Sequence, residues 1–227
     1  MAQSTWYLLE NGAHSAAANM AIDEALLVSC AKAGAPILRF YGWSEPAASF
    51  GYFQHYADVE RMTALRLLVR RPTGGGLVPH DADWTYSLVF PPEHAWYALK
   101  AIESYKRLHE WVQKALQECG LTTDLAAAAN KSAPGQCFAG PEQFDVVWKG
   151  RKLAGAAQRR TRNGLLIQGS IQPPAGGDRK QWEAAMCGIA VKDWGVAWRP
   201  LEMSSDVARH VDALEAKYGG AEYNRRR

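Results

Sequence analysis

Residues 70–81, RRPTGGGLVPHD, place two arginines, three consecutive glycines and a histidine within one short segment. A tight turn needs one or two glycines, so three indicate that another group lies against the main chain. The segment matches neither the phosphate-binding GxxxxGK[ST] loop nor the GxGxxG dinucleotide fingerprint.

Lysine and cysteine are the other reactive residues that stand out. Lys152 lies in GRKLAGAAQ, where it could simply be exposed on a hairpin. Cys137 lies in a Gly/Pro-rich loop, which is less typical of a core residue than the apolar helix faces that hold Cys30 and Cys119. None of the four cysteines forms a CxxC pair and no Cys/His cluster has zinc spacing, so no metal site is predicted.

Apolar spacing and turn residues predict the elements that must position these side chains. Helices are expected over 15–33, 95–119 and 178–187, and residues 124–136 read as a loop or a frayed helical stub. Strands are expected over 36–43, 46–53, 66–71, 84–90, 144–148, 153–160 and 165–171, with a hairpin turn at Asn163-Gly164. Without repeats or a clear linker, residues 1–227 are predicted to form a single domain of mixed α and β structure.

Composition limits the classes of function. Hydrophobic residues make up 48% of the 227 and charged residues 22%, which is typical of a soluble globular protein. A net charge of +3 is too small to indicate nucleic acid, although an acidic protein partner fits it. No apolar stretch approaches the ~20 residues needed to span a bilayer, and no signal peptide is evident. We therefore expect a cytoplasmic protein that binds neither nucleic acid nor membrane.

Extended by six residues, the glycine segment reads RRPTGGGLVPHDADWTYS (70–87) and resembles the signature of the lipoate-protein ligase A and octanoyltransferase family. NMAIDEALL (19–27), LRFYGWSEPAASFGYFQ (38–54) and GRKLAGAAQRRTRNGLLIQGSI (150–171) resemble further segments of that family, in the same order. The resemblance implies an α+β fold: a mixed, mainly antiparallel sheet with packed helices, as in the catalytic domains of biotin and lipoate protein ligases.

The same resemblance implies the site. The glycine turn would lie along the acyl chain, with Arg71 and His80 beside its polar head, although His80 could instead be a hydrogen-bonded histidine that orients the turn. Lys152 would point at the substrate carbonyl, where an ammonium stabilises a developing oxyanion. The implied substrate-binding residues are Arg71, Gly74, Gly75, Gly76, His80, Gly155, Ala156 and Ala157.

Cys137 distinguishes between branches of the family. GQCFAGPEQFDVVWKGRK resembles the cysteine loop of LipM-type octanoyltransferases, which implies that Cys137 and Lys152 are catalytic. A thiolate nucleophile would hold the acyl group as a thioester, and a nearby cation such as Lys152 would favour the thiolate. Two readings compete with this one: a structural role for Cys137, or a nucleophile at Cys187 in MCGIA, which resembles the LipB-type motif.

The implied reaction is transfer of an octanoyl group from acyl carrier protein to a protein lysine, in protein lipoylation. No cofactor is expected for it. The implied partners are octanoyl-acyl carrier protein and the lipoyl domains of 2-oxoacid dehydrogenases or the glycine cleavage H protein. Arg159, Arg160 and Arg162 could dock such acidic partners or could lie on a solvated hairpin. The alternatives are a lipoyl amidotransferase, a non-enzymatic binding protein, and an ATP-dependent lipoate-protein ligase or its large subunit, which alone would need ATP and Mg.

Overall fold

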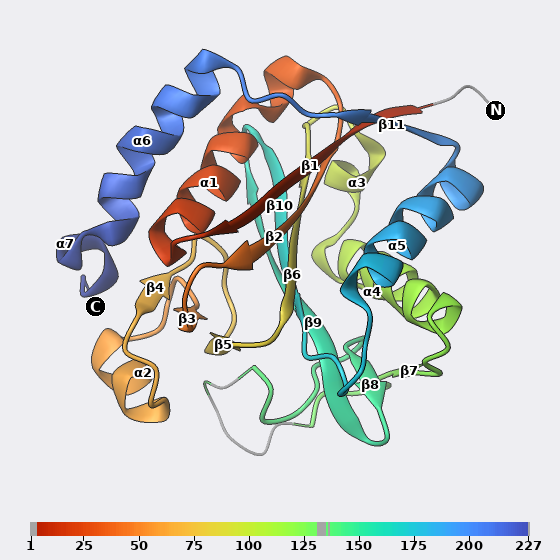
Figure 1. The fold of residues 1–227 in the computed structure, drawn as a ribbon, viewed down its shortest axis with the longest axis horizontal. Coiled ribbons are helices and arrows are strands. Elements are labelled where there is room, and N and C mark those ends of the chain that lie inside the picture. The colour runs from red at the N-terminus through yellow and green to blue at the C-terminus, as the bar shows by residue number, and fades with distance from the viewer. Residues whose placement is uncertain (1–3, 131–134, 136, 227) are drawn as a thin grey trace.

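A computed structural model describes residues 4–130, 135 and 137–226. The strands of the larger sheet are β1 (Ser4–His14), β2 (Ile37–Trp43), β6 (Trp84–Phe90), β7 (Asp124–Leu125), β8 (Val146–Trp148), β9 (Arg151–Thr161), β10 (Gly164–Ile171) and β11 (Val196–Pro200). Their order is β11–β1–β2–β6–β10–β9–β8–β7 (Figure 1). Only β11–β1 and β1–β2 pair in parallel among these described strands. The expected mixed, mainly antiparallel sheet is therefore confirmed.

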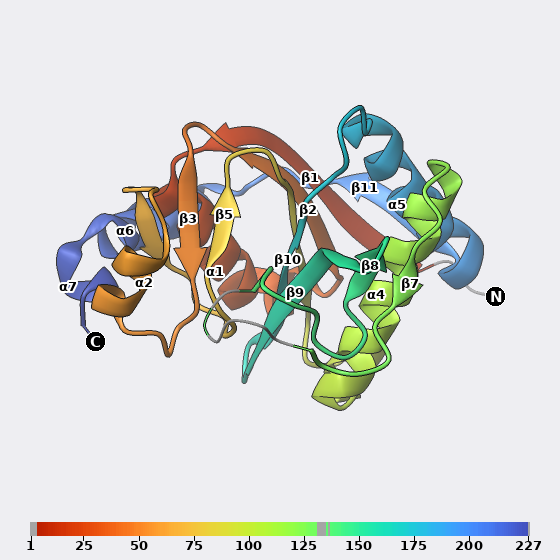
Figure 2. The same cartoon turned by 90° about the horizontal axis from the view of Figure 1, so that it is seen from below.

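A smaller sheet holds the residues on either side of the glycine segment. Its strands are β3 (Ala47–Phe50), β4 (Leu68–Arg70) and β5 (Val78–His80), in the order β4–β3–β5. Figure 2 shows this sheet beside β9 and β10, with the short helix α2 (Tyr56–Met62) at its outer side. The glycine turn thus connects two strands of the small sheet and faces the large one.

Helices cover both faces of the large sheet. The helices are α1 (Ala16–Ala33), α3 (Ala95–Ala98), α4 (Ala101–Glu118), α5 (Arg179–Trp194), α6 (Ser205–Gly219) and α7 (Ala221–Asn224). One apolar core joins the sheet to α4 and α5, and a second joins it to α1 and α6 (Figure 1). Neighbouring residues on β6 illustrate the alternation: Leu88 is buried in the first core and Val89 in the second.

The ends of α1 show how local sequence sets this framework. The Ser15 side chain accepts a hydrogen bond from the backbone N–H of Ala18, and Gly34 closes the helix with a left-handed φ of 67°. The expected helix over 15–33 is confirmed. Its Cys30 is fully buried, as expected, whereas Cys119 is half-buried against the first core.

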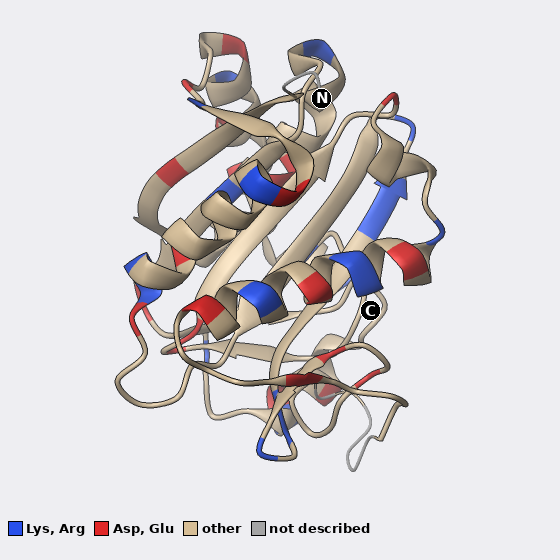
Figure 3. Ribbon diagram, turned by 90° about the vertical axis from the view of Figure 1, so that its right-hand side faces the viewer, with Lys and Arg blue, Asp and Glu red and all other residues tan. Residues whose placement is uncertain are grey.

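The expected helix over 95–119 is interrupted. Leu99 is extended, with ψ of 147°, and Lys100 starts α4 with its N–H donated to the Glu103 carboxylate at 2.9 Å. This capping bond satisfies the Lys100 N–H and stabilises the start of a second helix at this point. Charged residues of both signs follow one another along α4 (Figure 3), and Lys106 and Glu110 form an ion pair at 3.7 Å.

The sequence did not predict all the helices and strands of the C-terminal part. Helix α5 continues to Trp194, beyond the expected end near 187, and stops at Gly195 with φ of 65°. Strand β11 and helix α6 were not predicted, since the sequence there shows little apolar patterning. Of the α6 residues, only Val211 and Tyr218 are buried. Among the described residues, no helix combines the length and apolar character that crossing a membrane requires.

In the part of 124–171 that the structure describes, the chain forms strands, turns and loops. The expected strands over 144–148, 153–160 and 165–171 correspond to β8, β9 and β10, which confirms the meander. Thr161 pairs with Gly164, so the hairpin turn is one residue earlier than the expected Asn163-Gly164. The described part of 124–136 contains β7 and no helix, and residues 131–134 and 136 lie outside the described residues.

Candidate active site

The glycine turn is folded around the side chain of Arg71, which is 4% exposed. Its guanidinium donates to Gly74 O from Nε at 3.0 Å and from Nη2 at 2.6 Å, and to Gly76 O from Nη2 at 2.7 Å. Gly75 has φ of 86°, and a Cβ there would lie 2.8 Å from Nη2. Both the backbone conformation and the close approach therefore require glycine at this position.

Cys137 packs directly on this turn. Leu77 N donates to Gly135 O at 2.8 Å and Cys137 N donates to Leu77 O at 3.1 Å, which pins the cysteine loop to the small sheet. The Cys137 sulfur accepts the Gly76 N–H at 3.0 Å and lies 4.0 Å from Nη2 of Arg71. The glycine turn, which has no side chains, thus leaves room for the Cys137 thiol and the Arg71 guanidinium.

Lys152 reaches the same region from β9. Its side chain is 5% exposed, and Nζ lies 2.7 Å from Oδ2 of the fully buried Asp145. The ammonium also lies 5.3 Å from the centre of the Phe138 ring, in the residue after the cysteine. Lys152 is therefore a buried cation whose charge is balanced by a carboxylate.

Asp145 is held in place from two other segments. Its carboxylate accepts the hydroxyl of Tyr105 on α4 and the backbone N–H of Glu142. Burial, and then the Asp145 charge, raise the pKa of Tyr105 well above its usual value, so the hydroxyl remains a donor. These bonds fix the position of the carboxylate and hence of the Lys152 ammonium.

His80 is buried with both ring nitrogens engaged. Nδ1 lies 2.8 Å from Oδ2 of Asp83, and Nε2 lies 2.8 Å from Oγ of Ser49. The ring stacks on Trp43 with centroids 3.8 Å apart. His80 is therefore hydrogen-bonded through both ring nitrogens, as the second of the two expectations for it requires, and it also lines the cavity.

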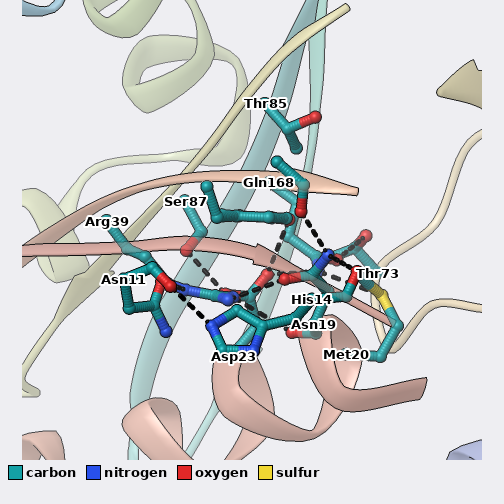
Figure 4. A network of polar contacts seen from close by, with 12 residues as sticks. Asn11, His14, Asn19, Met20, Asp23, Arg39, Thr73, Thr85, Ser87 and Gln168 are labelled. Carbon is teal, nitrogen blue, oxygen red and sulfur yellow. Dashed lines mark hydrogen bonds and ion pairs between the residues drawn. The ribbon is translucent and has the colours of Figure 1, made fainter. Parts of the chain in front are cut away.

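A buried polar network lies next to the cavity (Figure 4). Asp23 on α1 pairs with Arg39 on β2 at 2.8 Å, and both side chains are fully buried. Gln168 on β10 donates to Asp23 at 2.7 Å and accepts from Thr73, beside the glycine turn, at 2.7 Å. Through Gln168 the network connects helix α1 to the glycine turn.

These residues line one partly open cavity. Of the expected site residues, Arg71, His80, Cys137, Lys152, Gly155, Ala156 and Ala157 line it. A second, more open hollow is lined by Gly74, Gly75 and Gly76 and shares Cys137, Lys152, Ala156 and Ala157 with the first. The thiol and the ammonium thus face both an inner cavity and an outer groove.

Cys187 lies elsewhere. It is on α5, packs against the first core and lines neither the cavity nor the groove. Burial, followed by the charges of Glu10 and Glu183, raises the pKa of its thiol to about 12. A thiol in that state is a poor nucleophile at neutral pH, so the geometry favours Cys137 over Cys187.

The three hairpin arginines do not form one exposed patch. Arg160 donates to Leu99 O at 2.8 Å and Ser104 Oγ at 2.9 Å, and Arg159 donates to Pro72 O at 3.4 Å. Both are half-buried, and only Arg162 of the three is exposed. The suggested docking role is therefore unsupported for Arg159 and Arg160.

The sequence reasoning missed Asp145, Ser49 and Asp83, which hold Lys152, Arg71 and His80. It also missed the Asp23–Arg39 pair, although charged residues within apolar segments are a signal of buried ion pairs or sites. Among the described residues, no group of three or more His, Cys, Asp or Glu side chains is arranged to hold a metal ion.

Comparison with known proteins finds similar sequences in one family of catalytic domains. Residues 15–172 match the model of the lipoyl protein ligase A/B catalytic domain. The octanoyltransferase LipM of Kyrpidia tusciae is 39% identical over 181 residues, and that of Bacillus subtilis is 35% identical over 184 residues. These alignments cover 74% and 75% of this chain but 65% and 66% of the relatives, so the chain spans slightly less than two thirds of their length.

Solved structures share the fold. A lipoate-protein ligase A bound with ATP superposes with a TM-score of 0.78 at 20% identity, over 99% of both chains. A bipartite lipoate protein ligase of Thermoplasma acidophilum, solved in a study with its E2 lipoyl domain, gives a TM-score of 0.74 at 20% identity over 99% of this chain and 97% of its own. At this identity, the likeness concerns the fold alone.

Proposed function

Because the chain belongs to the lipoyl protein ligase A/B catalytic-domain family, we propose that it transfers an octanoyl group from acyl carrier protein to a lysine of a lipoyl domain. The single observation that carries this proposal is the position of Cys137. Its sulfur rests on the Gly76 N–H, between the inner cavity and the outer groove, with Lys152 lining both. An ATP-dependent ligase activates its substrate as an adenylate and has no need of a thiol there.

In the first half-reaction, the Cys137 thiolate attacks the carbonyl carbon of the octanoyl thioester. A bond forms between that carbon and the Cys137 sulfur, and negative charge develops on the carbonyl oxygen. The Lys152 ammonium, held by Asp145, stabilises this oxyanion. The bond to the carrier sulfur then breaks, and the carrier leaves as a thiolate that is protonated by solvent.

In the second half-reaction, a neutral lysine amine of the lipoyl domain attacks the Cys137 thioester. The C–N bond forms, the C–S bond to Cys137 breaks, and the nitrogen loses a proton to solvent. Exchange between thioesters is nearly isoenergetic and amide formation is downhill, so no ATP is needed. The acyl chain would enter along the inner cavity, which Gly155 and Ala156 of β9 line.

The proposed partners are octanoyl-acyl carrier protein as donor and lipoyl domains of 2-oxoacid dehydrogenases or the H protein as acceptors. The donor is tested by supplying octanoyl-acyl carrier protein or an octanoylated H protein and following a lipoyl domain by intact mass. Transfer from the carrier protein is expected. Transfer from the H protein alone would identify an amidotransferase instead.

A ligase reaction is tested in parallel with lipoate, ATP, Mg and the same lipoyl domain. We expect no lipoylation in this mixture. Lipoylation without any acyl carrier protein would contradict the transferase proposal.

A further inference from the structure

Within the part of the chain that the structure describes, no carboxylate is paired with Arg71. Its guanidinium is 4% exposed, and within the described chain every hydrogen-bond partner of it is a neutral oxygen or the Cys137 sulfur. A buried cation is costly unless an anion or several oriented dipoles balance it. The carbonyls of the glycine turn supply dipoles, and among the described hydrogen-bond partners of Arg71 the sulfur at 4.0 Å is the one that can become an anion.

The pKa of the guanidinium reflects these surroundings. Burial lowers the pKa of Arg71 from its ordinary value, and the neighbouring sulfur raises it. Arginine nevertheless keeps its proton at any physiological pH. The positive charge is therefore permanent and stays close to the reacting atom.

A chain of hydrogen bonds fixes the far side of the same guanidinium. Nη1 of Arg71 donates to Ser49 Oγ at 3.2 Å and to Ser49 O at 3.0 Å. Because a guanidinium can only donate, the Ser49 hydroxyl accepts this bond and can pass its own hydrogen to Nε2 of His80. Nδ1 of His80 then carries a hydrogen and donates it to Asp83.

Asp83, the last residue in this chain of hydrogen bonds, is held by further hydrogen bonds. Oδ2 of Asp83 also accepts from Thr85 Oγ1 at 3.0 Å and from Ser170 Oγ at 2.6 Å. The His80 ring cannot turn freely because it stacks on Trp43. All bonds from Arg71 to Asp83 point in one direction, which lets each polarise the next.

We propose that Arg71 is the cation that stabilises the Cys137 sulfur as an anion, and that Ser49, His80 and Asp83 are positioning residues that hold Arg71 against it. The inference deepens the proposed function, because it rests on Cys137 as the nucleophile. It assigns the two cations of the site different tasks: Arg71 faces the sulfur, and Lys152 faces the carbonyl oxygen.

Among the described residues, the other ionisable groups around the thiol do not provide this charge. Those lining the cavity and the groove are Tyr41, His80, Tyr105, Glu142 and Lys152. Lys152 is paired with Asp145, and the pKa values of Tyr41 and Tyr105 are raised by burial, so both phenols stay neutral. Glu142 is an acidic residue and supplies no positive charge.

The test is the pH profile of Cys137 alkylation by iodoacetamide, without any acyl donor. Alkylated peptides are identified by mass, and Cys30 and Cys187 serve as internal controls because burial raises their thiol pKa to about 12. In Arg71→Gln, we expect the midpoint of the Cys137 profile to rise by about one pH unit or more, with an unchanged plateau at high pH. Ser49→Ala and His80→Asn should raise it by a smaller amount.

Two variants serve as comparisons. Arg159→Gln removes a cation that is near the turn but does not contact the sulfur, and its midpoint should equal that of the unmodified protein. Lys152→Gln should move the midpoint less than Arg71→Gln does. A larger shift in Lys152→Gln, or a wild-type midpoint in Arg71→Gln, overturns the inference.

If Arg71→Gln does not fold, Ser49→Ala and His80→Asn decide the matter, since an unchanged midpoint in both contradicts the positioning chain. The result is separable from the proposed function, which fails if octanoyl transfer survives in Cys137→Ser. In that case the alkylation profiles still report whether Arg71 acts on the sulfur.

Discussion

The two cations of the site differ in how their charge is balanced. Lys152 is paired with the buried carboxylate of Asp145, whereas Arg71 is surrounded by backbone oxygens and the Cys137 sulfur. A buried pair of this kind contributes little when intact but is costly to break. The pair therefore keeps Lys152 in one place without neutralising Arg71.

Replacing Asp145 tests the pair at this scale. Asp145→Asn leaves the Lys152 ammonium buried without a counter-charge, so the free energy of unfolding should fall by about 3–5 kcal/mol. Urea unfolding measures the loss. The double variant Asp145→Asn/Lys152→Met removes the stranded charge and should be more stable than Asp145→Asn alone. Equal stability of the two variants would show that the pair is not the cause.

At the scale of elements, the glycine turn acts as a contact surface between the small sheet and the cysteine loop. A Cβ on Gly76 would lie 2.8 Å from the carbonyl carbon of Gly135 and 3.1 Å from Cys137 N, whereas one on Gly74 would meet nothing within 4 Å. Neither residue has a positive φ, so alanine differs from glycine here mainly by the methyl group.

These neighbours offer a matched pair of substitutions. Gly76→Ala should destabilise the protein by about 1–3 kcal/mol, because the methyl group must displace the cysteine loop. Gly74→Ala should change the free energy of unfolding by less than about 0.5 kcal/mol. Thermal unfolding of both variants measures the difference, and similar values for the two would contradict the packing described for the turn.

Local sequence patterns predicted helices and strands better than they predicted which residues contact one another. Residues 84–90 and 165–171 were predicted as strands because their apolar runs are bounded by turn residues, and the glycine motif identified one wall of the site. The break at Leu99 depends on a capping bond that periodicity does not reveal. The Ser49–His80 and Gly76–Cys137 contacts join residues 31 and 61 positions apart, so only the folded chain brings them together.

At the scale of the whole molecule, the C-terminal helices brace the strand that leads into the glycine turn. Asn224 accepts the Arg70 N–H at 2.7 Å and donates to Tyr218 O at 2.7 Å and Gly220 O at 3.1 Å. The Tyr218 hydroxyl donates to Glu24 on α1 at 2.8 Å. Residues with little sequence pattern thus connect α1 to the element next to Arg71.

Asn224→Ala should lower the free energy of unfolding by about 1–3 kcal/mol, because it removes side-chain bonds to buried backbone groups. Arg209→Ala on α6 is the control, since its ion pair with Asp206 is exposed and its loss should cost less than about 0.5 kcal/mol. Denaturant titration compares the two. An Asn224→Ala variant as stable as the control would mean that the C-terminal segment does not brace the turn.

The central claim is that Cys137 receives the acyl group, and intact mass spectrometry after mixing with octanoyl-acyl carrier protein tests it most directly. The account predicts a gain of one octanoyl group that is lost in Cys137→Ser and retained in Cys187→Ser. A gain that persists in Cys137→Ser, or that disappears in Cys187→Ser, would contradict it.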